Sequence, residues 1–379
     1  MSIAGGDDDA ASDGAVEALT ILGEHLINTI LEGGSQETIK EIIDQGAPLW
    51  YQNDSEGLSP LHAAAYMQDQ SLVKAFLEGG AVWNAVDHLN NTAGDIALSF
   101  NNQELYTTIR DAGIRAEMLL ALLGSGATPE PSSNLVLKNA DNSAAASTDT
   151  FLASNLSFKA DETGQEICVV KLDDDEEVGV MMGWERPIME ETVRCLCSDG
   201  GRQGLKVLNV GFGLGIIDSL FQSLSIPPSD HVIIEPHPDV LRHMKELGWL
   251  DRPGVRVLQG KWQDWINSDE LVAYGGFDVI YTDTFSEDYS DLRRFFEYLP
   301  DLMSGPNARF GFFNGLGATN PLFYDVYTHV AELHLADVGV DVEWKDVDVG
   351  DGKDRWGKTR QYFSLPRYRL PVGRMGVLS

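Results

Sequence analysis

A glycine-rich turn and an acidic residue further along the chain are the first residues whose types and spacing could do chemistry. The apolar run LKVLNV leads directly into Gly211–Ile216 (GFGLGI), and Glu235 ends the next apolar run, HVIIE. Glycines let the backbone turn tightly and come close to a nucleotide, with a helix N-terminus behind them. An acid at a strand end can accept hydrogen bonds from ribose hydroxyls. Together these residues predict a cofactor of the adenosine type.

Three later segments predict the rest of a ligand site. Asp283 ends the apolar run FDVIYTD, and strand ends of this kind line the ligand crevice of a doubly wound sheet. Trp262 and Gln263, in LQGKWQD, offer adenine an aromatic lid and a polar edge, although a plain core position explains Trp262 equally well. Asn314, in FFNGLGATN, would face the same crevice and contact substrate, or belong to an ordinary strand-to-helix loop.

Several features favour S-adenosylmethionine over a nicotinamide dinucleotide as the cofactor. The glycine spacing is G-F-G-L-G, and Glu235 continues into Pro236 and His237. Met181 and Met189 are eight residues apart, and their soft thioethers suit the methionine part of a sulfonium cofactor. Packing of a helix in the core explains the same methionine spacing, so these two residues are weak evidence by themselves.

The elements that must position these residues alternate along the second part of the chain. Apolar runs of strand length (LKVLNV, HVIIE, VRVLQ, FDVIYT and ARFGFF) alternate with amphipathic helical patterns, which predicts an α/β fold with a doubly wound, mostly parallel sheet. The last segment, from VDVEW to RYRL, reads as two strands joined by a polar turn. An antiparallel terminal hairpin on such a sheet indicates the seven-stranded methyltransferase variant of the fold.

The first part of the chain contains a repeat instead. Ser59–Ala64 (SPLHAA) is echoed by Thr92–Ala97 (TAGDIA) at an offset of 33 residues, and the second copy is degraded at Gly94 and Asp95. The segment resembles ankyrin repeats, which are all-α stacks that bind partners or stabilise a neighbouring domain. We therefore expect an ankyrin-like domain over 1–125, a Gly/Ser/Ala-rich linker over 126–148 and a methyltransferase domain over 149–379.

Composition limits the classes of function. With 27 Lys and Arg against 59 Asp and Glu, the net charge is −32, which argues against direct nucleic-acid binding and suits a basic protein partner. Solubility alone explains the same charge. The sequence contains no apolar run long enough for a membrane span, and its three cysteines and eight histidines form no metal-ligand pattern, so we expect no metal. We expect a cytoplasmic protein, with the nucleus left open.

The catalytic segments together resemble one enzyme family. The runs VMMGWERPIM, GFGLGI, IIEPH and YTDTF are similar to those of guanidinoacetate methyltransferase. With the ankyrin-like part added, nearly the whole chain resembles the fungal protein arginine N-delta-methyltransferases, also called type IV. The resemblance implies S-adenosyl-L-methionine as the methyl donor and the internal guanidino nitrogen of a protein arginine as the acceptor.

The resemblance also implies roles for individual residues. Glu185 and Asp283 would be the catalytic carboxylates that bind the guanidino group, and Glu185 and Asn314 would contact substrate. Two carboxylates can hold a planar guanidinium through paired hydrogen bonds and accept its proton as the new bond forms. The implied cofactor-binding residues are Phe158, Met181, Met189, Gly211, Phe212, Gly213, Leu214, Gly215, Ile216, Glu235, Pro236, His237, Trp262, Gln263 and Asp283.

Two alternatives remain at the level of sequence. One is a small-molecule guanidino N-methyltransferase of the guanidinoacetate type, with the repeats serving oligomerisation. The other is an ankyrin interaction protein whose methyltransferase domain is inactive. The sequence identifies neither the protein substrate nor the oligomeric state.

Overall fold

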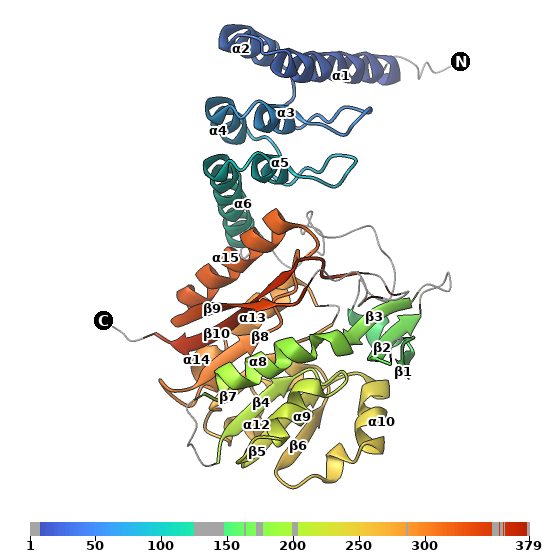
Figure 1. Cartoon of the computed structure of the whole chain (residues 1–379), viewed down its shortest axis with the longest axis vertical. Helices are drawn as coiled ribbons and strands as arrows, with labels where there is room; N and C mark the ends of the chain where they lie inside the picture. Colours follow the sequence, from blue (N-terminus) through green and yellow to red (C-terminus); the bar gives the residue numbers. More distant parts are fainter. Residues whose placement is uncertain are drawn as a thin grey trace, which may run out of the picture. The chain divides into compact units, whose positions relative to one another are not determined.

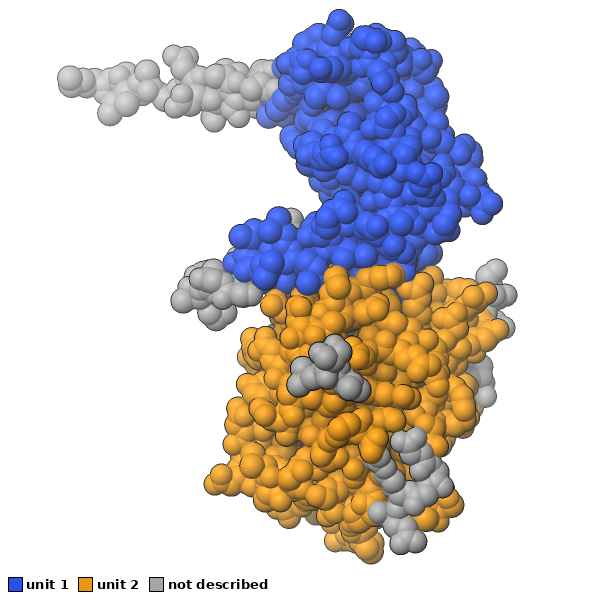
Figure 2. All heavy atoms as spheres, turned by 90° about the vertical axis from the view of Figure 1, so that its left-hand side faces the viewer, with its two compact units in different colours: residues 1–136, 320–327 blue, residues 137–319, 328–379 orange. Residues whose placement is uncertain are grey.

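The computed structural model contains two compact units, which Figure 2 distinguishes by colour. The structure describes residues 8–124, 148–162, 164–171, 177–198, 204–285, 287–350, 356, 359 and 361–376. Unit 1 contains residues 1–136 together with Asn320–Tyr327, and unit 2 contains 137–319 and 328–379. The predicted linker over 126–148 lies outside the described residues except for Thr148. No described helix has both the length and the apolar character that crossing a membrane requires.

Unit 1 consists mainly of three helix pairs in successive layers (Figure 1). The helices are α1 (Asp8–Leu31), α2 (Gln36–Asp44), α3 (Pro60–Tyr66), α4 (Gln70–Glu78), α5 (Ala93–Ser99) and α6 (Gln103–Gly124). The helices α3 and α5 begin at the offset at which the sequence repeats. Small residues at the helix contacts, such as the fully buried Ala63 and Ala64, let neighbouring helices approach closely.

Each repeated helix begins at a capping box. The Ser59 hydroxyl accepts from the backbone N–H of His62, and the His62 ring accepts from the backbone N–H of Ser59. Thr92 and Asp95 form the same reciprocal pair one repeat later. Burial lowers the pKa of His62, whose Nε2 bonds the Asn91 carbonyl at 3.1 Å, so the neutral ring connects successive repeats.

The degraded positions of the second repeat accommodate a segment from far along the chain. Asn320–Tyr327 packs within unit 1. The Asn320 amide donates to the Asp95 carboxylate at 2.6 Å, and a Cβ at Gly94 would lie 2.8 Å from Leu322. Glycine and aspartate therefore replace the Leu-His of the first repeat where this segment needs space and a hydrogen-bond acceptor.

Unit 2 contains the predicted seven-stranded sheet, in the order β6-β5-β4-β7-β8-β10-β9. Its strands are β4 (Lys206–Val210), β5 (Asp230–Glu235), β6 (Val255–Gln259), β7 (Val279–Thr282), β8 (Arg309–Phe312), β9 (Val340–Asp348) and β10 (Arg367–Met375). Strands β4 to β8 pair in parallel, and β10 pairs antiparallel with both β8 and β9. The terminal hairpin is confirmed. Successive strands β4, β5 and β6 extend the sheet in one direction and β7 and β8 in the other, so the strand order reverses at β4.

Helices precede β4 and separate the successive strands from β4 to β9 in the sequence. They are α8 (Arg186–Leu196), α9 (Ile216–Gln222), α10 (Pro238–Glu246), α11 (Trp262–Trp265), α12 (Asp269–Val272), α13 (Tyr289–Phe296), α14 (Leu299–Leu302) and α15 (Pro321–Asp337), with short 3₁₀ turns η1 (Gly183–Glu185) and η2 (Trp249–Asp251). Aromatic and aliphatic side chains from the strands and helices, including Phe277, Phe296 and Phe310, form the buried core.

A second, three-stranded antiparallel sheet was not predicted from the sequence. It contains β1 (Leu156–Ala160), β2 (Glu166–Lys171) and β3 (Glu177–Met182), and follows the short helix α7 (Thr148–Leu152). Met181 therefore lies on a strand, while Met189 lies on α8, so the two methionines are not on one helical face.

A buried polar cluster joins β4, α9 and β5 below the strand ends. The Asp218 carboxylate accepts from Asn209 at 2.9 Å and lies 3.0 Å from His231 Nε2, and all three side chains are fully buried. Gln222 lies 2.9 Å from the other ring nitrogen of His231. Because the oxygens of an ionised carboxylate only accept, the Asn209 amide and the Nε2–H of His231 are the donors to Asp218.

Asp218→Ala should lower the free energy of unfolding by about 2–4 kcal/mol, because it leaves two buried donors without their acceptor. Urea denaturation monitored by circular dichroism measures the loss. The matched control is Asp251→Ala, at an exposed position of η2, for which we expect a change of no more than about 0.5 kcal/mol. Equal effects of the two substitutions would show that the cluster does not stabilise the sheet.

Candidate active site

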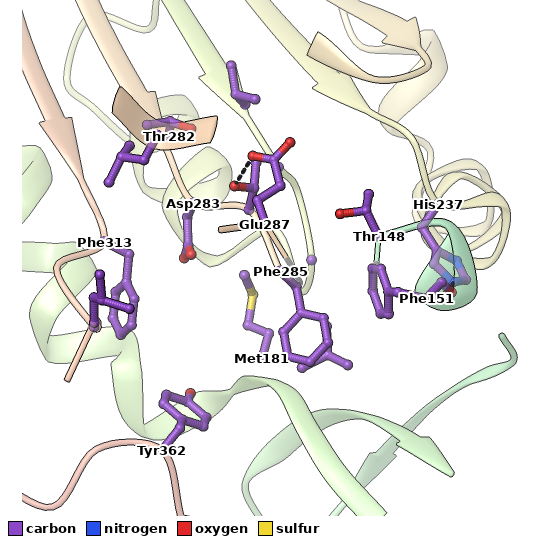
Figure 3. Close-up of a pocket in the computed structure, with 18 of the residues that line it drawn as sticks. Thr148, Phe151, Met181, His237, Thr282, Asp283, Phe285, Glu287, Phe313 and Tyr362 are labelled. Atoms are coloured by element: carbon purple, nitrogen blue, oxygen red, sulfur yellow. Dashed lines mark hydrogen bonds between the residues drawn. The ribbon is translucent and has the colours of Figure 1, made fainter. Parts of the chain in front are cut away.

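A cavity of about 510 Å³ opens at the carboxyl ends of β4, β5 and β7 (Figure 3). Gly211, Glu235 and Asp283 line it, and each lies at the end of one of these strands or directly after it. This is the edge at which doubly wound sheets bind ligands. The volume falls in the range of about 300–1,000 Å³ that is typical of small-molecule sites.

The glycine turn brings the backbone of β4 against that of β7. Gly211 has a φ of +93° and Gly213 a φ of +54°, a region that side chains disfavour. A Cβ on Gly211 would collide with the backbone carbonyl of Asp283, and one on Gly213 would collide with Met181. The absence of side chains here leaves one wall of the cavity as bare backbone.

Glu235 is anchored by backbone donors at the end of β5. Its carboxylate accepts from the N–H of Phe212 at 2.8 Å and from the N–H of His237 at 2.7 Å. Burial raises the pKa of Glu235 to about 7, although these N–H groups stabilise its charged form. A carboxylate held in this way can accept a hydrogen bond from a hydroxyl group of a ligand in the cavity.

Glu287 organises the third part of the wall, and the sequence analysis did not predict it. Its carboxylate accepts from the indole N–H of Trp262 at 2.9 Å, from the Gln263 amide at 3.0 Å and from the Thr284 hydroxyl at 2.6 Å. One acid thereby fixes the orientation of three side chains, of which Trp262 and Thr284 line the cavity.

Glu185 and Asp283 form the acidic centre of the site. Glu185 ends η1 and is only 3% exposed, and the hydroxyl of Tyr362 donates to its Oε1. Burial and, secondarily, the charge of Asp283 raise the pKa of Glu185. Burial also raises the pKa of Asp283 to about 7. Because each negative charge is costly here, the pair favours a cationic ligand.

The other charged residues of the lining are mostly acidic as well. Among the described residues that line the cavity, five are acidic and Lys261 is the one Lys or Arg. Lys261 already pairs with Asp149 at 2.7 Å. The cavity therefore attracts cations and provides no unpaired Lys or Arg side chain, among its described lining residues, for an anionic group of a ligand.

The structure brings many of the predicted site residues together. Those that line the cavity are Met181, Glu185, Gly211, Gly213, Glu235, Pro236, His237, Trp262 and Asp283. Those that do not line it are Phe158, Met189, Phe212, Leu214, Gly215, Ile216, Gln263 and Asn314. Of the second group, Phe212 packs edge-on against Trp249. The Met189 sulfur lies 3.4 Å from the hydroxyl of Tyr281, in the core.

Phe158 was predicted to cover the cofactor, but the phenylalanine of this segment that lines the cavity is Phe151. Both belong to the run FLASNLSF. Phe158 lies on β1, where its ring stacks on His243 with a centroid distance of 4.1 Å. Phe151 lies on α7 and packs beside His237 and Phe285, facing the cavity in Figure 3.

Asn314 is buried away from the cavity. Its backbone N–H donates to the Tyr368 hydroxyl at 2.8 Å, and its amide donates to the Thr328 hydroxyl at 3.2 Å. These contacts connect the end of β8 to β10 and α15. The neighbours Phe313 and Gly315 line the cavity in its place.

Comparison with known proteins points to one group of enzymes. The model of the guanidinoacetate N-methyltransferase family matches residues 172–301, and the ankyrin-repeat model matches residues 56–88. A protein named protein arginine N-methyltransferase 2 from Cryptococcus neoformans is 41% identical over 90% of this chain and 92% of its own length. Proteins of the same name from Aspergillus fumigatus and Neurospora crassa are 36% and 37% identical, covering 85% and 89% of this chain and 82% and 92% of theirs.

Asp283→Asn should stabilise the protein at pH 8. In the wild type the folded-state pKa of Asp283 lies above that of the unfolded chain, so ionisation costs stability as the pH rises from about 4 to about 7. The amide removes this cost, and we expect a gain of about 1–3 kcal/mol at pH 8 that disappears near pH 4.

Thermal and urea unfolding across this pH range measure the effect. Asp251→Asn, at an exposed position, is the control and should follow the wild type at every pH. If Asp283→Asn is no more stable than the wild type at pH 8, the acid pair is not under electrostatic stress.

Proposed function

The chain belongs to the family of fungal enzymes named protein arginine N-methyltransferase 2, and on that premise we propose a specific reaction for it. The enzyme transfers a methyl group from S-adenosyl-L-methionine to the internal, or delta, guanidino nitrogen of arginine in a basic protein substrate. The choice of the internal nitrogen rests on the resemblance to the type IV enzymes.

The observation that supports the proposal most is the acid pair formed by the buried Glu185 and the partly buried Asp283. Arginine and the sulfonium cofactor carry one positive charge each, and ionised Glu185 and Asp283 carry two negative charges. Burial raises the pKa of both carboxyl groups, so each is ionised most readily when cations enter the cavity. The two charges of the acid pair are therefore balanced when both ligands are bound.

The residues of the cavity also fit S-adenosyl-L-methionine. Gly211 and Gly213 provide bare backbone, and the Glu235 carboxylate is placed to accept ribose hydroxyls. Trp262 lines the cavity, where its aromatic ring is suited to cover an adenine. When bound, this cofactor supplies an electrophilic methyl group.

The acid pair then acts on the guanidinium. Protonated arginine is a poor nucleophile, because its nitrogen lone pairs are delocalised and the group stays charged at neutral pH. A carboxylate clamp holds the plane of the group still, and one carboxylate accepts the proton that the nitrogen loses as it is methylated. Asp283 is suited to this proton transfer because its pKa of about 7 is close to physiological pH.

The charge of the cavity supports a protein arginine over a free guanidino acid. A small guanidino acid brings a carboxylate in addition to that of the cofactor, and this second carboxylate needs its own cationic or N–H partner. Among the described lining residues, Lys261 is the one Lys or Arg, and it is paired with Asp149. An arginine within a polypeptide carries no such carboxylate. The match to the guanidinoacetate N-methyltransferase model keeps a small-molecule acceptor as the second candidate.

Glu235→Gln should weaken S-adenosyl-L-methionine binding at least about 10-fold, because a charged acceptor contributes about 1.5–3 kcal/mol to a hydrogen bond. In the wild type, binding should tighten from pH 6 to pH 8, since the pKa of Glu235 and that of Asp283 are both about 7, and the variant should lose the part of this dependence that Glu235 contributes. Isothermal titration calorimetry measures both effects. Glu246→Gln, at an exposed position of α10, should bind like the wild type.

Asp283→Asn should lower kcat by about 10²–10⁴-fold, which is the usual contribution of a general base. The assay uses labelled cofactor and proteins of a lysate from cells that lack the gene. Mass spectrometry of the labelled peptides then locates the methyl group, which we expect on the internal nitrogen of arginine. Asp251→Asn should retain wild-type activity.

The remaining outcomes separate the alternatives. Label on free guanidino compounds and on no protein would assign the enzyme to the small-molecule class. No transfer, despite cofactor binding measured by calorimetry, would make the chain a binding protein. Label on a terminal guanidino nitrogen would retain arginine methylation and contradict only the proposed position.

A further inference from the structure

The proposed methyl transfer requires different roles of the two carboxylates of the acid pair. The inference that assigns these roles therefore rests on the proposed function. One must remain charged to hold the guanidinium, and the other must accept a proton. Glu185 and Asp283 are both carboxylic acids in the same cavity, so their chemistry alone does not separate these roles. Their hydrogen-bond partners do.

Tyr362 distinguishes the two acids. It lies in the connection between β9 and β10, and its hydroxyl donates to Oε1 of Glu185. Among the described residues, no side chain donates a hydrogen bond to Asp283, whose backbone N–H bonds the carbonyl of Val210 at 2.9 Å. In Figure 3 the ring of Tyr362 lies across the cavity from Asp283, with its hydroxyl turned inward.

Aromatic neighbours hold the Tyr362 ring in this orientation. Its centroid lies 4.5 Å from that of the buried Trp356, at an interplanar angle of 79°. The ring centroid of Phe313, which also lines the cavity, lies 6.5 Å from that of Tyr362. The ring centroid of Trp184, the residue before Glu185, lies 6.1 Å from it. The ring and the acid therefore share one packed cluster, which limits the freedom of the hydroxyl to turn elsewhere.

We propose that Tyr362 is a positioning residue that keeps Glu185 ionised and fixed as the guanidinium clamp, which leaves Asp283 as the carboxylate that accepts the proton. A hydrogen bond donated to a carboxylate stabilises its charged form and leaves its second oxygen for the substrate. As the nitrogen–methyl bond forms, the sulfur–methyl bond breaks and its electron pair stays on sulfur. The nitrogen–hydrogen bond also breaks, and the proton moves to Asp283. Glu185 keeps its charge throughout, and the methylated guanidinium remains a cation.

The direct test is Tyr362→Phe, which removes one oxygen and retains the ring and its packing. We expect kcat for the arginine acceptor to fall about 10- to 100-fold, the usual effect of losing a hydrogen bond to a charged group. The KM for S-adenosyl-L-methionine should stay within about 2-fold. The acid limb of the kcat/KM profile should move to higher pH, because Glu185 loses the donor that favours its charged form. Tyr66→Phe, at an exposed position of unit 1, should change none of these values.

A double substitution separates positioning from loss of packing. In a Glu185→Gln background there is no carboxylate charge for Tyr362 to stabilise, so Tyr362→Phe should cause little further loss of kcat. Full and independent losses from the two substitutions would overturn the inference. So would a Tyr362→Phe enzyme with a lower kcat and an unchanged pH profile.

The protein without ligands provides a readout that does not depend on activity. The pKa of Glu185 is raised on folding, so its ionisation lowers stability as the pH rises. The melting temperature should therefore fall as the pH rises, and in Tyr362→Phe this fall should continue to higher pH than in the wild type. In the variant that carries both Glu185→Gln and Tyr362→Phe, this difference from the wild type should disappear. Identical pH dependence in the single variant and the wild type would contradict the inference. A wild type that transfers no methyl group to arginine would overturn the proposed function and, with it, this inference.

Discussion

The enclosure of two carboxylates in one cavity is the constraint on which the rest of the site depends. Burial raises the pKa of Glu185 and Asp283, so their charged forms are stable only with cations or donors beside them. The Tyr362 hydroxyl supplies one donor. Lys261 is paired with Asp149 and does not neutralise the centre. The two acids therefore favour cations and disfavour anions.

The parallel sheet places Asp283 beside the glycine turn that lines the cavity. Asp283 follows β7 directly, and its backbone N–H bonds the end of β4. Gly211 must lack a Cβ because the carbonyl of Asp283 occupies the space that the Cβ would take. The same glycine that leaves bare backbone in the wall of the cavity thus lets Asp283 approach closely. Below this edge, the buried Asn209–Asp218–His231 cluster links β4, α9 and β5.

Unit 1 shows a related compromise between a repeat pattern and a particular contact. The second repeat departs from the first at Gly94 and Asp95, which contact Leu322 and Asn320 within this unit. Tyr106 adds a hydrogen bond of 3.0 Å to the buried Asp325. These departures match the requirements of a segment from the same chain, so at least this part of the repeat surface binds its own polypeptide.

The sequence by itself determined the sheet, the repeats and the residues at strand ends, because apolar periodicity and turn chemistry are local signals. Glu235 and Asp283 could be placed together since parallel strands end at one edge of a sheet. Only the tertiary structure decided which side chains of the irregular segments face the cavity. Phe151 and Phe158 belong to one short run, and packing against different neighbours turns one toward the cavity and the other toward His243. Tyr362 lies far from Glu185 in the sequence, and the return of the terminal hairpin brings its hydroxyl to that carboxylate. No local pattern encodes a contact of this kind, because its geometry depends on how distant elements pack.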